Sequence, residues 1–298
     1  VLLRERGISM PVVVLNADAD SFDQMIANRL EPEIYSFRSL ADFADAVSHA
    51  GETRYPVHIK LDTGMHRLGF MEGEIGRLCE VLPTLPAVKV ASVFSHLNCA
   101  DMPEEDAYTR EQIARYDRMS AAVAASLPYS VIRHTANSAA IERFPEARFD
   151  MCRLGLGLYG FGWEHNAGLR PVSALKTRIV QIKRLEAGDA VGYGRAGKLL
   201  RPTVTATVPI GYADGLDRHL GCGRWSMRVA GRPAPIVGRV CMDSCMIDVT
   251  DTHAQEGDAV IIFVDELPVS ELSDKLKTIP YEILTSISPR VKRVYFRE

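Results

Sequence analysis

Up to about residue 160, short apolar runs alternate with amphipathic stretches of helical period. The amphipathic stretches cover residues Leu40–His49, Glu72–Val81 and Glu104–Leu127. Strands that alternate with helices predict parallel β/α units. The apolar runs, which we interpret as strands, are Pro11–Asn16, Glu33–Phe37, Val57–Asp62, Val90–Leu97, Val131–Thr135 and Met151–Tyr159.

Polar residues at the ends of these predicted strands bear on the architecture. Asp62, His96, Asn137 and Gly155 each come at or after the end of a run. An open doubly wound sheet can hold six strands, but polar groups at the C-terminal end of strand after strand are typical of a (β/α)8 barrel. A closed barrel needs two more units, about 60–75 residues. Because Val1 to Arg4 read as the end of a helix, we expect those two units to precede Val1.

After Tyr159 the pattern changes to short alternations of Val, Ile and Thr, which Gly and Pro punctuate. This texture predicts a mainly antiparallel β domain with one helix near Ser270–Leu276. The fold class is therefore α/β plus all-β, with a barrel domain at residues 1–165 and a C-terminal β domain at residues 166–298. The predicted strands are Lys176–Leu185, Thr203–Ile210, Met227–Val229, Pro235–Val240 and Ala259–Phe263.

Composition narrows the class of protein. The 298 residues are 47% hydrophobic with a formal net charge of −3, as in a globular protein of one or two domains. Positive and negative residues are mixed along the chain without a basic stripe, which argues against a nucleic-acid-binding protein. No apolar run is long enough to span a membrane. Six scattered cysteines without a Cys-x-x-Cys pair favour a reducing, cytoplasmic setting, and the eight histidines form no metal-binding pattern.

Three stretches carry candidate chemistry. Val57–Phe70 holds Lys60, which fits a Schiff-base lysine or a strand-end lysine paired for solubility. Asn137-Ser138 opens a predicted helix. The free N–H groups at that helix start could bind an anion, or Asn137-Ser138 could be an ordinary N-cap. Tyr193 and Tyr212 lie between glycines, as in tyrosines presented at a cleft or held in a turn.

Eight motifs in order resemble the alanine racemase family, and together they span residues 57–290. The resemblance implies a barrel followed by a β domain, a pyridoxal 5'-phosphate cofactor, and interconversion of L- and D-alanine that supplies peptidoglycan synthesis. The motifs are I-K-L-D-T-G-M-H-R-L-G-F, F-S-H-L, H-T-A-N-S-A-A, R-L-G-L-G-L-Y-G, V-G-Y-G, P-I-G-Y-A-D-G, G-R-V-C-M-D and S-I-S-P-R-V.

The resemblance implies a role for each matching residue. Arg153 hydrogen-bonds the pyridine nitrogen, His96 lies near the ring, and Arg67 lies beside the phenolic oxygen and the substrate carboxylate. Tyr193 is a catalytic acid–base, and Met242 faces the substrate carboxylate through its backbone N–H. The phosphate is bound by Ser138, Gly155 and Leu156 with Asn137 beside them, and by Tyr281; Tyr212 and Asp243 line the entrance.

Two further expectations come from the family. Each active site is shared between two subunits, so we expect a homodimer in which the partner supplies Tyr193, Tyr212, Met242 and Asp243. The residue that matches Lys60 lies beneath Arg67 and in many members is carbamylated, so that it holds the arginine as an anion.

One departure from the family is large. The lysine that binds the cofactor covalently lies in a K-A-x-A-Y-G-type motif, and none of the eight lysines here has that context. We therefore expect this lysine in the units that precede Val1.

Two alternative functions stay open: a decarboxylase or racemase for another amino acid on the same fold, and a non-catalytic cofactor-binding protein. Arg153 argues against the decarboxylases, which carry an acidic residue at that place. The predicted second domain argues against the cofactor-carrier proteins, which consist of a single barrel.

Overall fold

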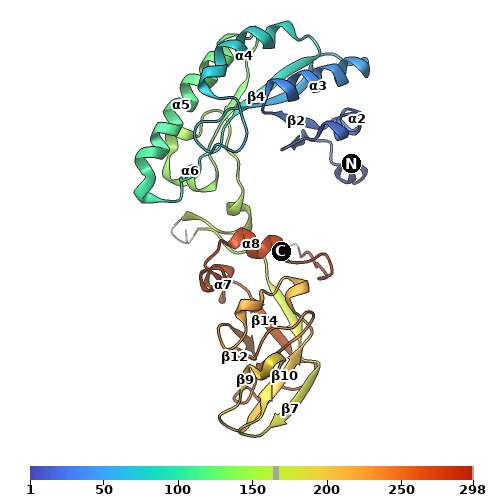
Figure 1. Cartoon of the computed structure of the whole chain (residues 1–298), viewed down its shortest axis with the longest axis vertical. Helices are drawn as coiled ribbons and strands as arrows, with labels where there is room; N and C mark the ends of the chain where they lie inside the picture. Colours follow the sequence, from blue (N-terminus) through green and yellow to red (C-terminus); the bar gives the residue numbers. More distant parts are fainter. Residues whose placement is uncertain (164–167, 297–298) are drawn as a thin grey trace. The chain divides into compact units, whose positions relative to one another are not determined.

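The computed structural model describes residues 1–163 and 168–296, which divide into two compact units, residues 1–166 and 167–298 (Figure 1). The predicted boundary between residues 165 and 166 lies outside the described residues. None of the helices in the described part of the chain is long and apolar enough to cross a membrane.

The first unit is built on a five-stranded parallel sheet in the order β1-β2-β3-β4-β5. This arrangement confirms the predicted parallel β/α units and agrees with the expected barrel class. The strands are β1 (Val13–Val14), β2 (Glu31–Ile34), β3 (Tyr55–Lys60), β4 (Val88–Phe94) and β5 (Ile132–His134). The helices are α1 (Leu2–Glu5), α2 (Phe22–Ala27), α3 (Phe37–His49), α4 (Ile75–Val81), α5 (Asp106–Ala125) and α6 (Ser138–Arg143).

Local sequence explains where α3 begins and which side it buries. The Ser36 hydroxyl accepts a hydrogen bond from the backbone N–H of Ser39, and the Ser39 hydroxyl caps the Ser36 N–H in return. Leu40, Phe43 and Val47 then recur at helical spacing and are all buried. This face packs into the same core as α4 and α5, so the three helices cover one side of the sheet (Figure 1).

The two faces of β3 differ in chemistry. Val57, Ile59 and Leu61 are fully buried in the core beneath the helices. Because successive side chains point to opposite faces of a strand, His58 and Lys60 lie on the other side. Neighbouring strands add polar residues to that side, and all are linked by the contacts described below. We call it the polar face, formed by Glu31, Glu33, His58, Lys60, Ser92 and His134.

The predicted strand at Met151–Tyr159 is wrong. The segment begins beside β5, where Asp150 N donates to Arg133 O at 3.0 Å and Arg153 N donates to Ala136 O at 2.9 Å. It then leaves the sheet, because the N–H groups of Gly155 and Gly157 donate to the Ser138 hydroxyl instead of a neighbouring strand. Leu156–Tyr159 forms a 3-10 helix.

The second unit holds a seven-stranded antiparallel sheet in the order β6-β14-β11-β12-β13-β10-β7, which confirms the predicted β domain. Its strands are β6 (Leu175–Arg178), β7 (Gln181–Leu185), β10 (Thr203–Val208), β11 (Ser226–Val229), β12 (Arg232–Val237), β13 (Cys245–Asp248) and β14 (Ala259–Phe263). A separate pair consists of β8 (Ala190–Val191) and β9 (Gly197–Lys198), and two helices follow, α7 (Val269–Leu276) and α8 (Pro280–Ser286).

Three details of the second unit differ from the prediction. The run Lys176–Leu185 is two strands, because the chain changes partner: Ile179 N donates to Asp258 O and Val180 N donates to Thr207 O. The strand β13, whose Cys-Met-Ile-Asp pattern is short, was not predicted from the sequence. Nor was α8, which starts with proline at its first position.

Gly69 offers a stability test of the loop that follows β3. Its φ is +126°, and an added Cβ would lie 2.7 Å from the backbone nitrogen of Asp62. Gly69→Ala should therefore lower the free energy of unfolding by about 2 kcal/mol or more in urea titrations. Gly76 in α4 has open space around it, so Gly76→Ala should be neutral or stabilising by up to ~1 kcal/mol. Equal effects of the two changes would contradict this geometry.

Candidate functional site

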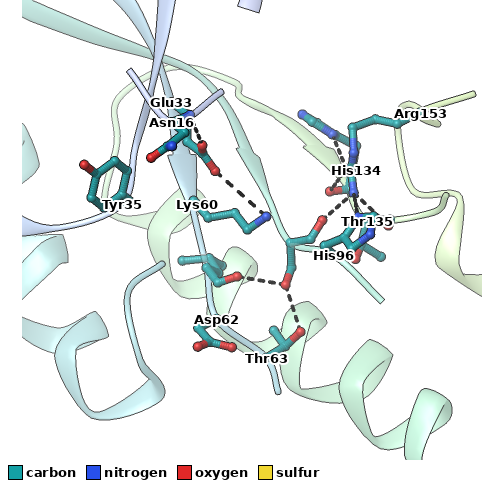
Figure 2. Close-up of polar contacts among 12 residues, drawn as sticks. Asn16, Glu33, Tyr35, Lys60, Asp62, Thr63, His96, His134, Thr135 and Arg153 are labelled. Atoms are coloured by element: carbon teal, nitrogen blue, oxygen red, sulfur yellow. Dashed lines mark hydrogen bonds and ion pairs between the residues drawn. The ribbon is translucent and has the colours of Figure 1, made fainter. Parts of the chain in front are cut away.

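Arg153 is the centre of the site in the first unit (Figure 2). Its Nη1 donates to His134 Nδ1 at 2.8 Å and to the His134 carbonyl at 3.2 Å. Its Nη2 donates to the carbonyl oxygens of Ser95 at 2.5 Å and Thr135 at 3.1 Å. Burial lowers the pKa of Arg153 to about 10, so the guanidinium stays charged at neutral pH. The ends of β4 and β5 thus fix a cation whose side chain remains partly exposed.

Two neutral imidazoles lie beside this cation. Burial, and then the charge of Arg153, lower the pKa of His134 to about 3 and that of His96 to about 4. His96 Nδ1 lies 3.4 Å from Arg153 Nη2, and the Phe94 ring stacks on His134 with an interplanar angle of 6°. His96 is therefore close to Arg153 and uncharged at neutral pH.

Lys60 points across the polar face toward β2 (Figure 2). Its Nζ lies 3.9 Å from Glu33 Oε1, and both side chains are buried. Burial lowers the pKa of Lys60 to about 8, although the charge of Glu33 opposes that shift. The other oxygen of Glu33 accepts a hydrogen bond from the Asn16 N–H at 2.6 Å. The Lys60 ammonium thus has a buried, oriented carboxylate partner.

The turn after β3 is closed by Asp62. Its carboxylate accepts hydrogen bonds from the backbone N–H groups of Gly64 at 2.9 Å and His66 at 3.0 Å. Burial alone would raise the pKa of Asp62, but these hydrogen bonds lower it below its ordinary value. The loop returns to β3 where Phe70 N donates to Lys60 O. Arg67 lies in this closed loop and is exposed.

The predicted phosphate-binding segments come together. The Ser138 hydroxyl accepts from the N–H groups of Gly155 at 3.0 Å and Gly157 at 3.2 Å, so Leu156 lies between two anchored residues. Asn137 caps α6 through the Ala140 N–H and donates its own amide to the Leu97 carbonyl. The N–H groups that begin a helix have no acceptor within it, which suits an anion.

In the second unit, three motif loops pack on one another. Tyr212 N and Ala213 N donate to the carbonyl oxygens of Cys241 and Met242. A Cβ on Gly211 would lie 2.4 Å from the Cys241 carbonyl oxygen, so glycine permits this approach. The loop of Tyr193 packs through its flanking glycines against Arg239. Tyr193, Tyr212, Met242 and Asp243 are exposed.

The S-I-S-P-R-V motif supports the same loops from another side. Ser288 N donates to the Asp214 carbonyl, and Arg290 Nε lies 3.6 Å from Asp214 Oδ1. Tyr281, which we expect at the phosphate, lies in α8 with 38% of its surface exposed. These residues lie in the second unit and Arg153 and Ser138 lie in the first, so a site shared between the units stays a prediction.

The first-unit residues fit pyridoxal 5'-phosphate. They combine an anion cradle at Ser138, a charged donor at Arg153 and a neutral ring at His96. The Thr135 hydroxyl is buried beside them and has no hydrogen-bond partner among the described residues, so the site holds an unsatisfied polar atom as well. Four polar-face residues were not predicted as part of the site: Glu31, Glu33, His58 and Ser92. Their only signal in the sequence is a polar residue within an otherwise apolar strand.

Comparisons with known proteins agree with this reading. The model of the alanine racemase N-terminal domain matches residues 1–162, and that of the C-terminal domain matches residues 172–295. The chain is 37% identical to an alanine racemase from Desulfovibrio desulfuricans, covering 98% of this chain and 80% of the relative, and 34% identical to one from Clostridium novyi, covering 100% and 79%.

Solved structures lead to the same family. The alanine racemase from D-cycloserine-producing Streptomyces lavendulae matches with a TM-score of 0.93 at 30% identity, covering 100% of this chain and 81% of that one. The alanine racemase from Bartonella henselae with covalently bound pyridoxal phosphate matches with a TM-score of 0.87 at 29% identity, covering 99% and 82%. The chain belongs to the alanine racemase family.

Proposed function

We propose that this protein is an isomerase that interconverts L- and D-alanine with pyridoxal 5'-phosphate. The observation that carries the proposal is Arg153, a charged donor fixed at the carboxyl ends of β4 and β5 beside the Ser138–Gly155 cradle. When bound, the cofactor withdraws electrons from the substrate Cα and so acidifies its proton. D-alanine from this reaction would serve peptidoglycan synthesis in the cytoplasm.

Each first-unit residue has a defined task in this proposal. Arg153 would donate a hydrogen bond to the pyridine nitrogen of the cofactor, and because a guanidinium cannot accept a pyridinium proton, that nitrogen would stay unprotonated. Ser138, Gly155 and Leu156 hold the phosphate with Asn137 beside them, and Tyr281 adds its hydroxyl. His96 would lie by the cofactor ring. Arg67, at the closed loop after β3, would bind the phenolic oxygen and the substrate carboxylate.

Inversion at Cα requires a base on one face and an acid on the other. Tyr193 supplies one of these groups through its phenolic oxygen. The opposite group in the family is the lysine that binds the cofactor. Lys60 does not suit that task, because its Nζ is directed to Glu33.

The remaining second-unit residues support a shared site in a homodimer. Tyr193, Tyr212, Met242 and Asp243 are exposed in the second unit, so a partner subunit's first unit can reach them. Met242 offers its backbone N–H to the substrate carboxylate, while Tyr212 and Asp243 line the entrance.

Lys60 is best assigned as the buried ion-pair partner of Glu33 and not as a covalent cofactor ligand. Glu33 already supplies a buried negative charge within 3.9 Å of Lys60 Nζ. A carbamate on Lys60 would place a second anion beside that carboxylate at a cost that burial increases. We therefore propose that Lys60 remains an ammonium in this protein.

The central activity test compares Tyr193→Phe with Tyr295→Phe, a change at an exposed tyrosine that has no role in the site. Protein expressed from the intact gene includes any residues that precede Val1. Tyr193→Phe should lose roughly 10²–10⁴ in kcat for L- to D-alanine conversion, while Tyr295→Phe keeps the wild-type rate. Release of CO2 from ornithine or lysine would instead indicate a decarboxylase, and cofactor binding without turnover of any amino acid would indicate a non-catalytic carrier.

The Lys60 assignment is tested by NMR titration of lysine side chains labelled with 13C at Cε. Wild-type Lys60 should titrate near the value of about 8 that burial gives it. Glu33→Gln should lower that pKa further, because the carboxylate stabilises the ammonium. Added 13C-bicarbonate should give no carbamate resonance in wild type. A Lys60 carbamate in wild type, or a pKa that rises in Glu33→Gln, would contradict the assignment.

A further inference from the structure

A row of hydrogen bonds crosses the polar face from β2 to β5. Glu31 Oε2 lies 2.7 Å from His58 Nε2, and His58 Nδ1 lies 2.6 Å from Ser92 Oγ. Ser92 Oγ lies 2.9 Å from His134 Nε2, whose Nδ1 meets Arg153 Nη1 at 2.8 Å. Four adjacent strands each contribute one residue, and His58 and Ser92 are register partners. The row runs without a gap from a carboxylate to the central arginine.

Arg153 fixes the direction of the hydrogen bonds between itself, His134 and Ser92. A guanidinium can only donate, so His134 Nδ1 must accept. The neutral ring then carries its proton on Nε2 and donates it to Ser92. With His58 neutral, the single hydroxyl proton of Ser92 goes to His58 Nδ1, and His58 Nε2–H donates to the Glu31 carboxylate. The row therefore has one polarity from Arg153 to Glu31.

Arg153 also lacks a direct counter-ion. Among the described residues, no carboxylate lies within ion-pair distance of its guanidinium, and its hydrogen-bond acceptors are carbonyl groups and imidazoles. Enclosed charges are ordinarily paired. Lys60 on the same face adds positive charge, and Glu33 is committed to Lys60 and the Asn16 N–H. Glu31 is the anion to which Arg153 is connected through hydrogen bonds.

We propose that Glu31, His58 and Ser92 are positioning residues that form a relay, with Glu31 as a remote counter-ion of Arg153. Hydrogen bonds in a chain polarise one another, so the carboxylate strengthens His134 as an acceptor for Arg153. Through His134 the relay fixes the orientation of the guanidinium. The hydrogen-bonded row is independent of the proposed function. Only its purpose, which is to orient Arg153 toward the pyridine nitrogen of the cofactor, rests on that function.

An alternative is that these side chains are merely satisfied polar groups in the interior. Under that reading, removing the charge of Glu31 affects His134 only through space, and the hydroxyl of Ser92 makes no difference to the effect. Under the relay reading, the effect passes through that hydroxyl. The two readings therefore differ in whether Ser92 is required.

The test uses protein with 15N-labelled histidine, without cofactor or substrate, so its outcome is independent of the proposed function. Glu31→Gln should shift the ring-nitrogen resonances of both His58 and His134. In a Ser92→Ala background, Glu31→Gln should still shift His58 but leave His134 in place. Ser92→Thr keeps the hydroxyl and should restore the response of His134. If Ser92→Ala does not fold, His58→Phe breaks the same row while keeping a buried ring.

Glu33→Gln is the matched control, since Glu33 is a carboxylate on the same strand and face but outside the row. Its effect on His134 should be the same whether or not Ser92 carries a hydroxyl. The relay is overturned if Glu31→Gln shifts His134 equally in both backgrounds, or in neither.

Discussion

The enclosure of one guanidinium at the carboxyl end of a parallel sheet is the constraint on which the first unit depends. A largely enclosed cation needs acceptors on several sides, and Arg153 obtains them from the carbonyl oxygens of Ser95, His134 and Thr135 and from imidazole nitrogens. The Ser95 and Thr135 carbonyl groups can turn toward Arg153 because they lie just past the ends of β4 and β5, and the His134 carbonyl accepts from both Arg153 and the Ser95 N–H. The neutral state of both imidazoles is a consequence of the same cation and the same burial.

This constraint divides the sheet into two faces with different tasks. Apolar side chains such as Val57 and Ile59 bury against α3, α4 and α5 and supply the hydrophobic stabilisation. The polar face holds ionisable groups that burial would otherwise penalise. Each is satisfied by a neighbour on an adjacent strand, as Lys60 is by Glu33. The hydrophobic side of the fold therefore makes the polar side possible.

The sequence was a good guide to the elements and to the motif residues, and a poor guide to their partners. The helical period of apolar residues predicted α3 and α5. The resemblance to the family indicated that Ser138 and Gly155 lie together. The strand at Met151–Tyr159 was wrong because the Ser138 hydroxyl, distant in sequence, takes the N–H groups that a strand would have used. Glu31 and His58 could not be assigned because their contact depends on strand register, which a single sequence does not reveal.

The most direct test of the account is the protonation state of the pyridine nitrogen beside Arg153. Protein expressed from the intact gene would be loaded with pyridoxal 5'-phosphate carrying 15N in the ring, and its 15N NMR spectrum measured near neutral pH. Because the Arg153 guanidinium can donate a hydrogen bond to this nitrogen but cannot accept one from it, we expect the chemical shift of an unprotonated pyridine. A pyridinium shift would show that Arg153 is not the partner of that nitrogen, and would contradict the role that the whole polar face supports.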